Sequence, residues 1–505
     1  MKDKLLILGD QAVALGALHA GISGVYAYPG TPSTEITEYI QSSPLGRGRG
    51  VYCDWCTNEK TAMEAALGVS AMTGTHGGLV VLVADDPSMH SSQNEQDSRF
   101  YGKFAMVPIF EPSSQQEAYD MVRDAFDLSE RVKLPVLMRL TTRMAHSRAV
   151  VVPAVSRDEN PLSFPEDRAR WVLLPVNARR RYNELLAVQA DLQRLSGASP
   201  YNSYRPGDRR GVVACGIAYN YLMENYPEGC GRTVLKISQY PLPVETLRRM
   251  VAECDEILVL EDGQPFVEEQ LRGLLDESGK IKGRMSGELP RAGELTPDNV
   301  RAALGLPAAP VADACARVVP RPPALCAGCG HRDVYEMLNE VAKEYENSKI
   351  FSDIGCYTLG ALPPFRAIDS CVDMGASITM AKGAADGGLF PSIAVIGDST
   401  FTHSGITGLL DAVNSRANIT VVISDNLTTA MTGGQDSAGT GKLEAICLGV
   451  GVEKEHVRVV VPMAKNYDEI RNVLREEIEY PGVSVIIPRR ECIQTLKRNL
   501  KKSKA

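Results

Sequence analysis

The sequence predicts an α/β protein of doubly wound, mostly parallel sheets, divided into three domains. Short apolar runs rich in β-branched residues alternate with runs of helical period along the chain, which is typical of parallel sheets covered by helices on both faces. The 505 residues suffice for about three domains of ~150 residues each. Two polar, proline-bearing stretches, 151–167 and 306–323, provide candidate linkers.

Each domain contributes its own set of expected elements. The two candidate linkers place the domain boundaries so that the predicted domains are 1–165, 166–310 and 311–505. The first has the densest alternation, with strands expected at 4–9, 25–29, 51–56, 79–84, 106–110 and 135–140 and helices at 11–20, 59–72 and 115–130. Further strands are expected at 212–215, 234–237 and 257–260, and then a strand–helix–strand unit at 392–397, 405–415 and 418–424.

Composition excludes several classes of partner. Lysine and arginine number 54 against 62 aspartates and glutamates, so the net charge of −8 argues against nucleic acids and anionic membranes. No apolar run approaches the roughly 20 residues that span a bilayer. The first ten residues, MKDKLLILGD, are too short and too acidic for a signal peptide. We therefore expect a cytoplasmic protein with neither a membrane nor a nucleic acid as partner.

The chain has twelve cysteines, and in a reducing cytoplasm we expect them to be free thiols rather than disulfides. Three of them lie in apolar surroundings and are expected to pack as small hydrophobic residues: Cys215, Cys254 and Cys447. Cys53 and Cys56 form one closely spaced pair, for which pocket lining is favoured over half of a zinc site. Cys326 and Cys329 form another, and a lone C-x-x-C is shared by metal and redox sites.

Polar residues follow two neighbouring strands of the last domain. Asp398 comes directly after the expected strand 392–397, and Asn426 follows the strand 418–424. Both positions lie at the carboxyl ends of parallel strands, where open α/β sheets bind ligands. Hard oxygen ligands next to a helix N-terminus suit Mg²⁺ and a diphosphate. The simpler alternative is a strand turn with a helix-capping aspartate.

The wider sequence around these positions resembles a known family. The segments GDSTFTHSG, DNLTTAMTGGQ and DMGASITMAKG are similar to those of thiamine diphosphate enzymes, and more narrowly to the large subunit of indolepyruvate:ferredoxin oxidoreductases within the 2-oxo acid:ferredoxin oxidoreductase family. YPGTPSTEI, NEKTAMEAALG, GIAYNYLMENY, VLKISQYPLPVETL and DIGCYTLG carry the resemblance over nearly the whole chain, in order. It implies the thiamine diphosphate-binding fold, with pyrimidine-binding, transketolase C-terminal-like and diphosphate-binding domains.

The resemblance implies a role for individual residues in binding the cofactor. Asp398, Asn426 and the carbonyl of Thr428 would hold Mg²⁺, and Gly397, Ser399 and Gly375 would contact thiamine diphosphate.

The same resemblance implies catalytic roles for two residues near the N-terminus. Glu59 looks like the glutamate that hydrogen-bonds the aminopyrimidine ring and so promotes loss of the thiazolium proton. Its alternative role is that of an acid favoured by a helix N-terminus. Thr31 would be the hydroxyl near the substrate, or otherwise a plain turn residue before Pro32.

The resemblance also implies a 4Fe-4S cluster. Cys326, Cys329, Cys356 and Cys492 would supply the four thiolates that such a cluster needs. Cys371 and Cys447 compete for the fourth position, and His331 is expected to be structural rather than a ligand.

The implied reaction is the oxidative decarboxylation of an aryl 2-oxo acid. Coenzyme A would accept the acyl group, and ferredoxin or an Fe-S partner chain would accept the electrons. A small γ-type (β) subunit would complete the enzyme, as a dimer of heteromers.

Two departures from the family weaken the assignment of indolepyruvate itself. Large subunits of this kind usually continue into a ferredoxin-like extension, which the printed sequence lacks, and the CAGCGH motif differs from the usual pattern around these cysteines. The alternatives are a non-oxidative thiamine decarboxylase and a cofactor-free scaffold or electron-transfer subunit. Candidates for binding the substrate carboxylate are Arg99, Arg143 and His403.

Overall fold

The computed structural model divides the chain into two compact units. It describes residues 4–72, 77–160, 175–274, 279–290, 293–310, 315, 317–319, 321, 323–371, 373–386 and 388–502. The first unit holds residues 1–56 and 60–313, and the second holds 314–505 together with Thr57–Glu59. Both predicted domain boundaries, and parts of both predicted linkers, lie outside the described residues.

The first unit contains thirteen described strands and twelve described helices. The strands are β1 (Leu5–Leu8), β2 (Gly24–Ala27), β3 (Tyr52–Trp55), β4 (Val80–Asp85), β5 (Ile109–Phe110), β6 (Val136–Thr141), β7 (Arg148–Val151), β8 (Ser203–Arg205), β9 (Asp208–Cys215), β10 (Arg232–Ile237), β11 (Gln239–Tyr240), β12 (Glu256–Leu260) and β13 (Ile281–Lys282). The helices are α1 (Gly9–Ala20), α2 (Thr34–Ser42), α3 (Pro44–Arg49), α4 (Glu59–Met72), α5 (Arg99–Ala105), α6 (Gln115–Val132), α7 (Thr142–His146), α8 (Pro175–Gly197), α9 (Ala218–Asn225), α10 (Val244–Glu253), α11 (Phe266–Leu274) and α12 (Pro297–Ala303). The first residue of α4, Glu59, groups with the second unit.

The sheets of the first unit are mostly parallel. One has the order β11-β5-β6-β4, in which only β11 runs antiparallel, and another has the order β13-β12-β9-β10-β8, in which only β8 does. β2 and β3 form a separate parallel pair. β1 instead pairs antiparallel with β7, which the parallel-sheet expectation does not include. β1 lies in the strand expected at 4–9, whereas β7 is not among the expected strands, and propensity does not specify which edges pair.

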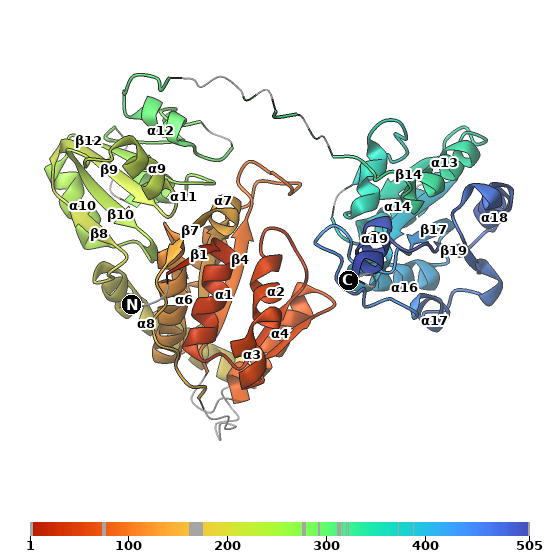
Figure 1. The fold of residues 1–505 in the computed structure, drawn as a ribbon, viewed down its shortest axis with the longest axis horizontal. Helices are drawn as coiled ribbons and strands as arrows, with labels where there is room; N and C mark the ends of the chain where they lie inside the picture. The colour runs from red at the N-terminus through yellow and green to blue at the C-terminus, as the bar shows by residue number, and fades with distance from the viewer. Residues whose placement is uncertain are drawn as a thin grey trace. The chain divides into compact units, whose positions relative to one another are not determined.

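The start of α1 is fixed tightly within this unit. α1 packs along α6 and α2, which lie beside it in Figure 1. A Cβ atom on Gly9 would lie 1.9 Å from the carbonyl oxygen of Met144 in α7, so only glycine permits this approach. The backbone N–H of Gly9 also donates to the carbonyl of Ser147 (3.2 Å). The first turn of α1 is therefore held against the end of α7.

The second unit is built on one fully parallel six-stranded sheet. Its strands are β14 (Lys349–Ser352), β15 (Ser370–Cys371), β16 (Ser392–Gly397), β17 (Ile419–Ser424), β18 (Val457–Val460) and β19 (Val483–Pro488), in the order β15-β14-β16-β17-β19-β18. Its helices are α13 (Gly330–Ala342), α14 (Ala376–Asp386), α15 (Asp398–Thr400), α16 (Ile406–Ser415), α17 (Leu443–Gly449), α18 (Tyr467–Glu479) and α19 (Ile493–Lys502), with single turns at η2 (Cys356–Ala361), η3 (Phe401–Gly405), η4 (Lys454–His456) and η5 (Ala464–Asn466).

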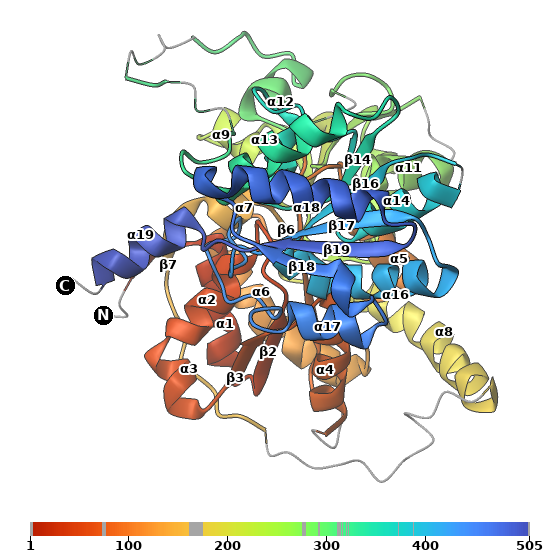
Figure 2. The ribbon, with the colours of Figure 1, turned by 90° about the vertical axis from the view of Figure 1, so that its right-hand side faces the viewer.

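Alternating side chains of the central strands fill two separate cores. Along β16, Ile393 and Val395 pack with α13 and α18 on one face, while Ala394 and Ile396 pack with α14 and α16 on the other. Figure 2 shows α13 and α18 on the opposite side of the sheet from α16 and α17. This doubly wound arrangement confirms the predicted fold class.

The strand order reverses between β14 and β16. The chain passes from β14 to β15 on one side, and then from β16 to β17 on the other. Ligands of open α/β sheets bind at the carboxyl ends of strands beside such a reversal. No helix in the described part of the chain is both long and apolar enough to cross a membrane.

Candidate active site

Asp398 stands at the carboxyl end of β16 as the first residue of α15. Its side chain is buried, and its Oδ2 has no hydrogen-bond partner among the described residues. Burial, aided by the nearby Asp425 carboxylate, raises the pKa of Asp398 to about 7. A buried, ionised carboxylate without a donor is unfavourable unless it takes up a proton or a cation reaches it. Asp398 therefore fits a metal ligand better than a helix cap.

The loop after β17 faces the same end of the sheet. The side-chain oxygen of Asn426 accepts the backbone N–H of Thr428 (3.1 Å), which folds the loop into a turn. The hydroxyl of Thr429 donates to the Ser399 hydroxyl (3.0 Å) and so joins this loop to the turn after β16. The carboxylate of Asp425 is occupied by the Arg489 guanidinium (2.6 Å). Asp398 and Asn426 thus stand at the ends of neighbouring parallel strands, and their carboxylate and amide oxygens are of the kind that Mg²⁺ prefers.

Gly375 lies on a third loop of this edge, before α14. Its φ of +96° and the 2.6 Å that would separate an added Cβ from the Cβ of Ser404 both require glycine. Its backbone N–H donates to the carboxylate of Asp353 (3.2 Å), which also accepts the hydroxyl of Ser377 (2.6 Å). Asp353 is fully buried, and burial raises its pKa to about 6. It organises this loop, although the sequence analysis assigned it no role; its position directly after the strand β14 was the available signal.

Glu59 contacts His403 within the second unit. The Nε2 of His403 lies 2.8 Å from Oε2 of Glu59, and the Asn58 side chain donates to the His403 carbonyl (3.0 Å). The hydrogen bond with His403 lowers the pKa of Glu59 below its ordinary value. The Glu59 side chain is 71% exposed, so its other side remains accessible to a ligand. Thr31 is exposed in the turn between β2 and α2 of the first unit.

Four cysteines from distant parts of the sequence line one cavity. Cys326, Cys329, Cys356 and Cys492 all border it. Burial raises the pKa of Cys356 to about 12, and the neighbouring Cys329, Cys492 and Cys326 thiols add to the effect. The side-chain amide of Gln494 donates to the Cys326 sulfur (3.2 Å). The arrangement offers four sulfur ligands to one group, which fits a 4Fe-4S cluster.

The competing cysteines do not border this cavity. Cys447 lies on the buried face of α17, and Cys371 directs its sulfur to the Asp353 carbonyl at 3.7 Å. Asn426 does border the cavity, and its backbone carbonyl accepts the N–H of Cys492 (3.1 Å). The loop of the predicted magnesium site therefore touches the segment that carries the fourth cysteine.

His331 lines the same cavity from the first turn of α13. Its ring is buried, and neither ring nitrogen has a hydrogen-bond partner within the described ranges. Burial lowers its pKa to about 4, so the imidazole is neutral near pH 7. The ring packs edge-on against Tyr357 at 6.1 Å between centroids.

Comparison with known proteins identifies the family of the chain. The family of thiamine pyrophosphate enzyme C-terminal, TPP-binding domains matches residues 353–487. The indolepyruvate oxidoreductase subunit IorA of Archaeoglobus fulgidus is 37% identical over 97% of this chain and 86% of its own length. The chain belongs to the indolepyruvate oxidoreductase IorA family. IorA of Methanothermobacter thermautotrophicus is 36% identical over 97% of the chain and 87% of its own length.

A solved structure is also similar in part. The 2-oxoglutarate:ferredoxin oxidoreductase of Magnetococcus marinus, with 2-oxoglutarate, coenzyme A and succinyl-CoA bound, aligns with a TM-score of 0.46 at 15% identity, over 60% of this chain and 65% of its own. The family membership confirms the predicted enzyme class, a thiamine diphosphate-dependent 2-oxo acid:ferredoxin oxidoreductase. The individual site residues stay predictions.

The candidates for the substrate carboxylate differ in accessibility. Arg99 is fully buried and hydrogen-bonds Asp97 (2.8 Å) and Glu261 (3.1 Å). Arg143 pairs with Glu294 (3.2 Å). Both guanidinium groups thus have carboxylate partners within the first unit. Of the three candidates, His403 is the one in contact with a predicted catalytic residue.

Proposed function

We propose that this chain is the catalytic subunit for oxidative decarboxylation of an aryl 2-oxo acid of the indolepyruvate type. The 2-oxo acid and the thiol of coenzyme A would give an acyl-CoA, CO₂, one proton and two electrons. The electrons would pass through a 4Fe-4S cluster to ferredoxin or an Fe-S partner chain. The observation that carries the proposal is the cavity that four cysteines and Asn426 line together. It would place the 4Fe-4S cluster, which carries one electron at a time, next to the thiamine site, where two electrons are released.

Some residues of the chain would bind the cofactor, and others would transfer a proton. Thiamine diphosphate, when bound, supplies a nucleophilic carbon and an acceptor for the electrons left by CO₂. Asp398, Asn426 and the Thr428 carbonyl would hold Mg²⁺, which would neutralise the charge of the diphosphate. Gly397, Ser399 and Gly375 let backbone approach the cofactor. Glu59 exchanges a proton with the ring, and His403 holds the Glu59 carboxylate at 2.8 Å.

The cysteine cavity decides between oxidative and non-oxidative chemistry. A 4Fe-4S cluster, when bound to Cys326, Cys329, Cys356 and Cys492, takes up electrons singly. Without it, the same thiamine site would support only a non-oxidative decarboxylase, and a chain without thiamine would be a scaffold or an electron-transfer subunit. Because the shared cavity favours the oxidative reaction, a small γ-type subunit and coenzyme A are expected partners, and a dimer of heteromers is the expected assembly.

Anaerobic purification with metal and cofactor analysis tests the proposal. We expect about four iron atoms and one thiamine diphosphate per chain. Cys492→Ala should lose iron while keeping thiamine diphosphate, and should release aldehyde slowly without reducing ferredoxin.

Cys371→Ala is the matched control, since Cys371 is a half-buried thiol that lies outside the cavity. It should keep the iron content of the wild type. Normal iron and ferredoxin reduction in Cys492→Ala would reassign the fourth ligand, and an iron-free wild type would overturn the oxidative reaction.

A further inference from the structure

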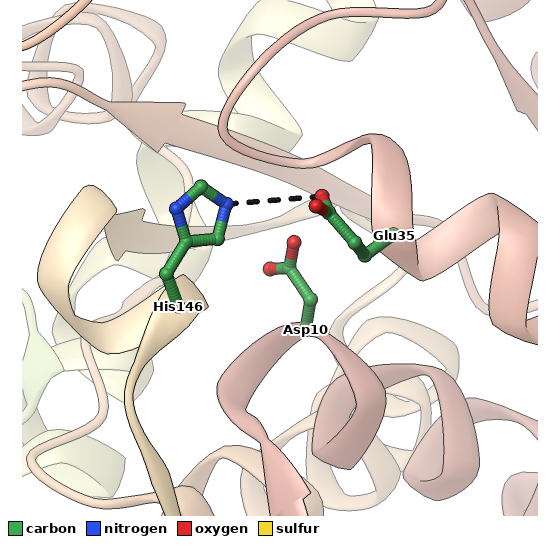
Figure 3. Close-up of side chains that lie close together, drawn as sticks. All are labelled: Asp10, Glu35 and His146. Carbon is green, nitrogen blue, oxygen red and sulfur yellow. Dashed lines mark ion pairs between the residues drawn. The ribbon is translucent and has the colours of Figure 1, made fainter. Parts of the chain in front are cut away.

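Three helix ends meet in the first unit, and none of the side chains that face one another there has a role assigned above. Asp10 lies in the first turn of α1, Glu35 in the first turn of α2, and His146 at the end of α7. One side-chain ligand atom from each lies within 4.8 Å of the other two. Figure 3 shows the three side chains facing one another. His146 Nε2 lies 3.7 Å from Glu35 Oε2.

Asp10 is the unusual member of this group. Its side chain is fully buried, and neither carboxylate oxygen has a hydrogen-bond partner in the described parts of the chain. Figure 3 shows the carboxylate pointing from the start of α1 toward Glu35 and His146. Burial, together with the Glu35 charge, raises the pKa of Asp10 to about 8. A donor-free carboxylate facing a second carboxylate is stabilised by a cation between them.

The surrounding backbone holds this group in place. Gly9, directly before Asp10, contacts the backbone of Met144 so closely that no side chain fits there. Asp10 is therefore fixed relative to the helix that carries His146. Glu35 and His146 are 41% and 38% exposed, so their side chains can rotate inward and water can reach the centre.

We propose that Asp10, Glu35 and His146 bind a divalent first-row transition-metal ion. Two carboxylate oxygens and one imidazole nitrogen suit ions such as Mn²⁺, Fe²⁺ and Zn²⁺, with water at the open positions. Ligand atoms around such an ion lie about 3 to 4 Å apart, given bonds of about 2.1 Å. A small rotation of Glu35 and His146 closes the present separations to that range. The ion would tie α1, α2 and α7 together, close to the turn that carries Thr31.

Binding of Mn²⁺ to the holoenzyme tests the site directly. Mn²⁺ prefers oxygen and nitrogen over thiolate, so the cysteine cavity does not compete. Saturating Mg²⁺ and thiamine diphosphate keep the predicted Asp398 site filled. Free Mn²⁺ is followed by its electron paramagnetic resonance signal. The wild type should bind one Mn²⁺ more per chain than Asp10→Asn, and Glu35→Gln should weaken that binding about tenfold or more.

The control is His90→Gln, which alters another partly exposed histidine beside a carboxylate, Glu294, at 3.3 Å. It should bind Mn²⁺ as the wild type does. Far-UV circular dichroism and Tm in metal-free buffer establish that each variant folds, and Mn²⁺ should raise the Tm of the wild type but not of Asp10→Asn. Co²⁺ absorption provides a second probe. If neither ion shows binding that depends on Asp10 or Glu35, the site does not exist.

Discussion

Replacing Asp398 by asparagine should stabilise the cofactor-free enzyme at pH 8 while abolishing cofactor binding. The pKa of Asp398 is about 7 in the fold against 3.8 for the free side chain, and one pKa unit corresponds to about 1.36 kcal/mol. Ionised Asp398 therefore costs the metal-free fold about 4 kcal/mol. Asparagine has nearly the same shape and removes this cost.

The direction in which stability changes with pH follows from the proton that Asp398 takes up on folding. Between pH 4 and 7 the folded chain holds a proton on Asp398 that the unfolded chain has lost, so the stability contributed by protonated Asp398 declines as pH rises and is gone above about pH 7. At pH 8 the asparagine variant should melt up to about 10 °C higher than the metal-free wild type, and the gap should shrink toward pH 5.

Differential scanning calorimetry at pH 5, 6 and 8, with and without Mg²⁺ and thiamine diphosphate, measures both effects. Cofactor should raise the Tm of the wild type most at pH 8, because the metal neutralises Asp398, and should leave Asp398→Asn unchanged. Asp369→Asn is the control, since it alters another acid of the second unit, one that pairs with Lys349 (3.2 Å), and it should not raise the Tm at pH 8. A metal-free Asp398→Asn that melts no higher than the wild type at pH 8 would refute the reasoning.

Two further predictions concern proton transfer. Glu59→Gln should keep thiamine diphosphate but lose hydrogen–deuterium exchange at the thiazolium carbon, measured by NMR, and exchange at the wild-type rate would remove Glu59 from the mechanism. His403→Gln should let the pKa of Glu59 rise toward its ordinary 4.5, because the hydrogen bond from His403 is the main cause of its lowering, so the acidic limb of the pH–rate profile should move to higher pH; an unmoved limb would separate the two residues.

Elements with a clear period were predictable from sequence. The helix expected at 59–72 is α4, and that expected at 115–130 is α6, which ends two residues later. Cys215, Cys254 and Cys447 are buried, as their apolar surroundings indicated. Periodicity reports local burial and therefore finds such elements. The pairing of β1 with β7 was missed because it depends on which strand edges meet across the fold.

The candidate site was predictable where a strand end and a motif coincide, as at Asp398 and Asn426. Contacts between distant segments carry no such signal. The sequence predicted His403 only as a candidate for binding the substrate carboxylate, because nothing in the sequence places it beside Glu59. Asp10 and Glu35 each look like an ordinary acid in a first helical turn, so only the fold reveals that they face one another.

The hydrogen bond between Cys492 and Asn426 has a consequence for how the enzyme matures and fails. Arg489, in the same segment as Cys492, pairs with Asp425, beside Asn426. Assembly of the proposed cluster would therefore brace the loop of the predicted magnesium site, so we expect the cluster to be inserted before thiamine diphosphate binds. Oxygen damage would begin at the same place, since loss of the cluster would remove this support and weaken binding of the diphosphate afterwards.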